Sequence, residues 1–209
     1  MTFEKVREPR WPAFVAMLSV AFLHLALPER LSVGPGWLLL AVVIALLIPI
    51  ITTYQLGHHN LTRLLTFAAN GVITLALIGS LVLLVEGLPK HKDPPGTLLR
   101  SAGSLWIANI LVFALWYWKL DAGGPLGRAQ LGGIERSAFL FPQMLRQPPQ
   151  QSWSPEFVDY LFLAFNTSTA FSPTDTAVLS RWAKAAMMLQ ALISLSIIAL
   201  LAARAVNVL

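Results

Sequence analysis

The sequence predicts an all-α, polytopic membrane protein with about five transmembrane helices and one half-length helix before the last of them. Of the 209 residues, 56% are hydrophobic and only 12% are charged, whereas soluble domains carry about 25% charged residues. The apolar residues also gather in runs of about 20, which is the length needed to cross a hydrocarbon core about 30 Å thick. The composition therefore predicts an integral membrane protein, with the lipid bilayer as its first partner.

Charge and motif content exclude several other classes of protein. The 15 bases and 10 acids give a net charge of +5, but the bases flank the apolar runs and form no basic run that would bind nucleic acid. The absence of cysteine excludes disulfides, Cys-ligated zinc and iron–sulfur clusters. Neither a catalytic set nor a metal-binding set of residues is recognisable, so we expect no enzyme, no cofactor and no metal site.

The first two spans are expected at residues 11–27 and 37–54. The first run follows a charged leader, but the sequence after it lacks the small-residue cleavage site of a signal peptide, so we expect a retained anchor. The second run contains Pro49, which a transmembrane helix tolerates if neighbouring groups satisfy the freed carbonyl. Both runs are therefore interpreted as transmembrane helices.

The third, fourth and fifth spans are expected at residues 64–85, 98–118 and 185–206. Glycines give the third run a small face suited to helix packing. The fourth run ends in Trp-Tyr-Trp-Lys, and aromatic residues followed by a lysine mark the point where a helix leaves the hydrocarbon. A Gly-, Pro- and Gln-rich stretch, residues 121–155, predicts an irregular extramembrane loop.

The segment between that loop and the last span does not fit a transmembrane helix. Ser154, Pro155 and Glu156 form a typical helix start, but the apolar run that follows, residues 157–165, would rise only about 14 Å as a helix. Ten mostly polar residues come next. We expect a re-entrant half-helix over residues 156–166 and an extended segment after it. The alternative is an interfacial helix followed by a connecting loop.

The run YLFLAFNTSTAFS, residues 160–172, resembles the pore loop of tetrameric, potassium-channel-like cation channels, which reads roughly Y-F-S-F-V-T-L-T-T-L-G-Y-G-D. The order of parts over residues 98–209, about half of the chain, also matches that module, whereas residues 1–97 form three additional membrane helices. In an ungapped comparison, the family's two threonines align with Thr167 and Ser168, its two glycines with Ala170 and Ser172, and its aromatic residue with Phe171.

The resemblance implies a homo-oligomer, a tetramer in that family, in which copies of the segment surround an axis and conduct a monovalent cation. The family's glycines reach backbone angles closed to other residues; because alanine and serine replace them here, strict potassium selectivity is not expected. The alternative function is a non-conducting membrane protein that binds a partner or a lipid. The filter-like residues are Thr167, Ser168, Thr169, Ala170, Phe171 and Ser172, and Asp175 is the candidate acid at the pore mouth.

The segments NILVFALWYWKLDAGGP, FLFPQM and NTSTAFSPTDT together resemble a family of bacterial membrane proteins, which implies a bacterial inner membrane location and no particular activity.

The distribution of charge conflicts with the membrane orientation of a channel-like module, because that orientation leaves ten bases outside and five inside. The positive-inside rule favours the reverse. Three alternatives remain: the module is inverted, residues 156–172 cross fully, or the first segment does not cross.

Overall fold

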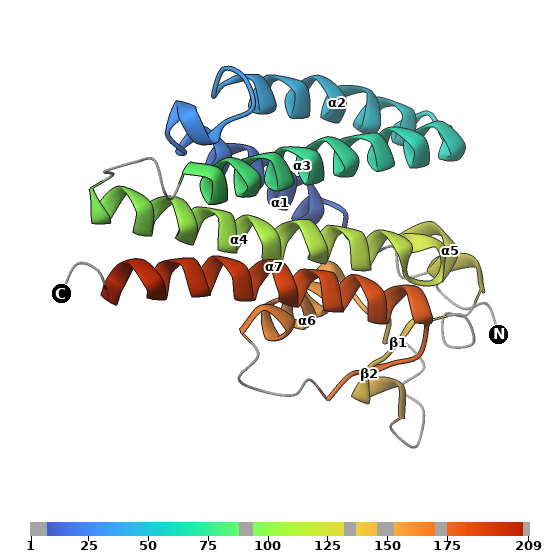
Figure 1. Cartoon of the computed structure of the whole chain (residues 1–209). Coiled ribbons are helices and arrows are strands. Elements are labelled where there is room, and N and C mark those ends of the chain that lie inside the picture. Colours follow the sequence, from blue (N-terminus) through green and yellow to red (C-terminus); the bar gives the residue numbers. More distant parts are fainter. Residues whose placement is uncertain (1–7, 88–93, 132–136, 146–152, 170–174, 207–209) are drawn as a thin grey trace.

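The computed structural model describes residues 8–87, 94–131, 137–145, 153–169 and 175–206, which form a bundle of helices (Figure 1). A two-stranded antiparallel ribbon lies at one end, with Phe139 opposite Val178. The chain also forms three short 3₁₀ turns, η1 (Glu29–Leu31), η2 (Asp121–Gly123) and η3 (Pro142–Leu145). The helices and strands are α1 (Trp11–Leu25), α2 (Leu38–Gln55), α3 (His59–Gly87), α4 (Pro95–Leu120), α5 (Gly124–Leu131), β1 (Phe139–Leu140), α6 (Phe157–Thr169), β2 (Ala177–Val178) and α7 (Arg181–Val206).

Four helical segments are long and apolar enough to cross a membrane, and they confirm the prediction of a helical, membrane-embedded protein. Each contains a window of 18 residues with few charges and a strongly apolar mean hydropathy. The apolar helix α1, with 15 residues, is shorter. The four segments are Leu38–Gln55, His59–Gly87, Gly96–Arg128 and Arg181–Ala202.

The helix α4 is the centre of the bundle. In its apolar window 61% of the residues are buried, compared with 22–33% in the other three segments. It contacts α1, α3, α6 and α7, and Figure 1 shows α7 lying along its length. The outward faces of the other helices are apolar, as lipid-facing surfaces must be.

The long helices alternate in direction, which places a different set of residues at each end of the bundle. At one end, the start of α1 meets the end of α2, because the Arg10 guanidinium lies 3.9 Å from the Tyr54 ring centre. The start of α3 meets the end of α4 there, because Phe67 lies below both Arg63 and Lys119. We call this the cationic end.

The other end of the bundle joins the end of α1 to the end of α3. His24, near the last turn of α1, lies 2.9 Å from the Ser32 hydroxyl and 3.4 Å from the Ser80 hydroxyl. All three side chains are buried. We call this the opposite end; α2 and α4 begin there, and α1, α3 and α7 end there (Figure 1).

Some boundaries differ from the sequence predictions for identifiable reasons. The helix α3 begins at His59, not near residue 64, because the polar residue Thr62 in its first turn is buried and finds a partner on α2. There the Thr62 hydroxyl donates to that of Thr53 at 3.0 Å. His59 and Asn60 therefore lie in the first turn of this helix. Within the described part of residues 121–155, the expected irregular loop contains α5, β1 and two 3₁₀ turns.

Candidate functional site

The chain reverses sharply where α4 ends, and this turn positions the polar residues of the cationic end. Ala122 has a φ of 48°, Gly123 of 80° and Gly124 of 78°, a left-handed region that glycine adopts without strain. A side chain at Gly124 would come within 2.8 Å of the Lys119 carbonyl oxygen. The turn brings α5 back against the last turn of α4, with Arg128 facing it.

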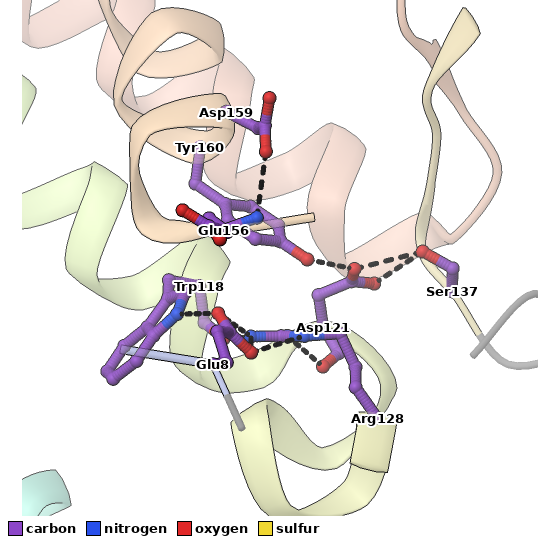
Figure 2. A network of polar contacts seen from close by, with 8 residues as sticks. All are labelled: Glu8, Trp118, Asp121, Arg128, Ser137, Glu156, Asp159 and Tyr160. Carbon is purple, nitrogen blue, oxygen red and sulfur yellow. Dashed lines mark hydrogen bonds and ion pairs between the residues drawn. The ribbon is translucent and has the colours of Figure 1, made fainter. Parts of the chain in front are cut away.

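Arg128 closes the carboxyl end of α4 and anchors the segment before α1 (Figure 2). Its Nη1 donates to the carbonyl oxygens of Trp118 at 3.0 Å and Asp121 at 2.9 Å, which are free because α4 has ended. Its Nη2 lies 2.9 Å from Glu8, and the Trp118 indole also donates to that carboxylate. Burial raises the pKa of Glu8 above its ordinary value, because desolvation outweighs the opposing effect of Arg128.

Asp121 ties the first turn of α6 to the end of α4. Its carboxylate is fully buried and accepts a hydrogen bond from the Tyr160 hydroxyl at 2.6 Å. The Ser137 hydroxyl and the Ala138 backbone N–H also point at it, as Figure 2 shows for the serine and the tyrosine. Three donors around one carboxylate provide the partners that a buried charge requires.

The helix α6 begins at the cationic end and stops beside the middle of α4 and α7. At its start, the Phe157 ring lies 6.0 Å from that of Trp118, and the Asp159 carboxylate accepts the Glu156 N–H at 2.7 Å. Near its end, the Phe165 ring lies 6.1 Å from that of Trp106. Thirteen residues rise about 20 Å. By Ala177 the chain is back at the cationic end, because β2 pairs with β1 there.

A buried polar cluster holds the last turns of α6 against α7. The Gln190 amide donates to the Ala164 carbonyl at 2.7 Å and to the Ser168 hydroxyl at 2.8 Å, and it accepts from Tyr117 at 2.6 Å. The Ser194 hydroxyl donates to Ser168 at 2.9 Å. Such bonds between helices are worth about 0.6 kcal/mol each in a membrane, but together they fix the position of α6.

The candidate filter residues fall into three groups. Thr167, Ser168 and Thr169 continue α6, so the extended segment expected from residue 167 does not begin there. The hydroxyls of both threonines donate to carbonyls of α6 itself, whereas Ser168 is buried against α7. Asp175 is exposed at the cationic end, just before β2. Ala170, Phe171 and Ser172 lie outside the described residues.

Sequence reasoning missed most of the residues that hold this region together. The sequence patterns single out neither Asp121 nor Gln190 as a site residue, yet both bond several segments. Asp121 and Tyr160 stand 39 positions apart and Tyr117 and Gln190 stand 73 apart, so no local spacing signals their contact. Among the described residues, no group of three or more potential metal ligands is found.

Comparison of the chain with family models, with curated proteins and with solved structures finds no match.

Proposed function

We propose that this protein is an oligomeric, channel-like membrane protein in which α6 enters the bilayer from the cationic end and the chain then turns back to the same end. One observation carries the proposal. The helix α6 starts at the level of Trp118, ends beside Gln190 and Ser194 towards the middle of α7, and is followed by the strand β2 at its own starting level. A polar backbone at that depth requires protein or water around it.

The same geometry supports α1 as a fifth span. Its first turn lies beside Tyr54 at the cationic end, and its last turn reaches Ser32 and Ser80 at the opposite end. Its 15 residues rise only about 22 Å. A helix shorter than the hydrocarbon core spans it by local thinning of the bilayer and by flanking residues, here Arg10 and η1.

Charge distribution supports an inverted module, with the cationic end in the cytoplasm. The positive-inside rule places the base-rich end there, so α6 enters from the cytoplasmic side, opposite to the potassium-channel arrangement. Among the described residues, Arg10, Arg63, Lys119, Arg128, Arg181 and Lys184 belong to the cationic end, and Arg30, Arg100 and Arg204 belong to the opposite end.

Two unpartnered apolar faces support assembly through α6 and α7. Side chains at helical spacing are exposed on each of these helices in the single chain: Val158, Phe162 and Phe165 on α6, and Met188, Leu192 and Leu195 on α7. In the proposed oligomer these faces meet neighbouring copies, and the carboxyl ends of the α6 helices converge. Their partial negative charge favours a cation, with Thr167 and Thr169 as hydroxyl ligands.

Cysteine labelling tests the re-entrant path, and the cysteine-free chain makes single-cysteine variants clean reporters. Glu156→Cys and Asp175→Cys replace exposed residues on either side of α6. We expect a membrane-impermeant maleimide to label both from the cytoplasmic side, and to label the reference variant Glu29→Cys, at the opposite end, only from the other side. Labelling of Glu156→Cys and Asp175→Cys from different sides would show that α6 crosses the membrane, and would contradict the proposal.

Cross-linking and liposome flux test conduction. We expect a closed oligomer and a monovalent-cation flux that Thr169→Val reduces about tenfold, which corresponds to a barrier increase of about 1.4 kcal/mol. Thr52→Val is the control, because Thr52 is also a threonine whose hydroxyl donates to a carbonyl of its own helix, at 3.1 Å to Pro49, but it lies in α2, away from α6. A monomer, or equal flux from both variants, would reject the pore.

A second candidate function is that of a non-conducting protein that binds a lipid or a partner. A different observation favours it: a pocket lined by cationic residues lies among α1, α2, α3 and α4 at the cationic end.

A further inference from the structure

A cavity within the described part of the chain opens at the cationic end. Its volume is about 550 Å³, within the range of about 300–1,000 Å³ that is usual for small-molecule sites. The first turns of α1, α3 and α7, the last turns of α2 and α4, the turn into α5 with its first residues, and the segment before β1 form its walls. Segments from across the described chain therefore build one concave site.

The described lining of this pocket is cationic and contains no acid. Arg10, Arg63 and Lys119 line it, together with His59, and neither aspartate nor glutamate does. Glu8, the acid of the neighbouring network, is already held by Arg128 at 2.9 Å. Glu8 also stabilises the charge of Arg10 from a distance, but the ion pair it forms among the described residues is with Arg128.

Aromatic rings hold these cations in place. The Arg10 guanidinium lies 3.9 Å from the Tyr54 ring centre, and Arg63 and Lys119 each lie 5.7 Å from that of Phe67. Cation–π contacts orient a cation without neutralising it. Burial lowers the pKa of Arg10 below its ordinary value, which reflects the cost of an incompletely solvated charge. An anion in the pocket would offset that cost.

The floor of the pocket is apolar. Ala13, Met17 and Ile50 line it and are almost completely buried. Tyr54 and Asn60 add polar groups nearer the cations. An inorganic ion alone would leave the apolar floor unfilled, whereas an anion with an apolar substituent would occupy both parts.

We propose that this pocket binds a phosphate ester with an apolar substituent, with Arg10 and Lys119 contacting the phosphate oxygens and Arg63 at the rim. Either an acidic phospholipid or a soluble phosphate ester supplies this chemistry. The pocket lies where α4 passes from apolar to aromatic and basic residues, which is the level of lipid headgroups. Basic pockets between helices on the cytoplasmic side are typical of headgroup sites. The proposal does not depend on whether the oligomer conducts.

Binding to the delipidated full-length protein in a non-ionic detergent tests the proposal. The probes are dioctanoyl phosphatidylglycerol, dioctanoyl phosphatidylcholine as the zwitterionic control, glycerol phosphate and inorganic phosphate. We expect phosphatidylglycerol to bind at least about tenfold more tightly than phosphatidylcholine, a preference that increasing salt weakens. Competition by glycerol phosphate would support a soluble ester as the source, and its absence would support a lipid.

Matched variants separate the site from general attraction to a basic surface. The double variant Arg10→Gln/Lys119→Gln should weaken phosphatidylglycerol binding about tenfold or more. Arg181→Gln/Lys184→Gln removes the same charge from exposed positions at the same end, outside the pocket, and should change binding less than about twofold. Equal weakening in both double variants would overturn the proposal.

Arg63→Gln provides a second test if the Arg10→Gln/Lys119→Gln variant does not fold. Arg63 is exposed at the rim of the pocket, so Arg63→Gln should fold and should weaken phosphatidylglycerol binding severalfold. Wild-type protein that binds the two lipids equally well, or an Arg63→Gln variant that binds phosphatidylglycerol as wild type does, would overturn the assignment. Inorganic phosphate that binds as tightly as phosphatidylglycerol would overturn the role of the apolar floor.

Discussion

Replacement of Asp121 by asparagine is expected to lower the midpoint of thermal unfolding in detergent by about 5–10 °C, equivalent to about 2–3 kcal/mol. The buried carboxylate accepts from Ser137, Ala138 and Tyr160. An asparagine of the same shape loses the charge and turns one acceptor into a donor, so these donors cannot all be satisfied. Circular dichroism during heating would measure the change.

Two further variants place the effect in this network. Tyr160→Phe removes one of the three donors, at 2.6 Å, so we expect about half the loss of stability caused by Asp121→Asn. Because the two residues share a bond, the double variant should lose less than the sum of the two single losses. A midpoint unchanged by Asp121→Asn, or fully additive losses, would contradict a carboxylate buried beneath these donors.

The helices were predictable from the sequence because hydropathy acts over long runs. All four long helices lie where the apolar runs predicted them, and the short apolar run after Glu156 forms the short helix α6; that α6 does not cross the membrane stays a prediction. Ends were less predictable where polar side chains find partners inside the bundle. The helix α6 continues through Ser168, whose hydroxyl contacts Gln190 and Ser194, although hydropathy alone ends the apolar run at Phe165.

The candidate sites depend on residues that only the tertiary structure brings together. Arg10, Arg63 and Lys119 each stand at the end of an apolar run, where a base is expected for an interfacial reason. They stand at the ends of three different helices, with Arg10 just before α1, and the alternation of helix direction brings them to one pocket. The sequence could therefore predict each base at a membrane surface but not their convergence, and the same holds for Asp121 and Tyr160.

Replacement of Gly127 by alanine is expected to be the most disruptive exchange of a single methyl group in this region. A Cβ at Gly127 would lie 2.2 Å from the Ala122 carbonyl oxygen. That oxygen belongs to a left-handed residue whose φ is 48°, in the turn between α4 and α5. Because the neighbour is backbone, it cannot rotate away, so α5 must shift. The expected loss is about 3 kcal/mol or more, or a failure to accumulate folded protein.

Gly103→Ala is the matched control for this prediction. Gly103 lies within α4, and nothing stands within 4 Å of the position that its Cβ would occupy. Alanine is the better helix former by about 1 kcal/mol, so thermal unfolding of this variant should match or exceed that of wild type. A displaced α5 would also move Arg128 away from Glu8 and from the Trp118 carbonyl. The loss of stability in Gly127→Ala should therefore overlap with that in Arg128→Gln, so the double variant should lose less than the sum of the two single losses. Equal unfolding midpoints for Gly127→Ala and Gly103→Ala would show that α5 does not press on this turn.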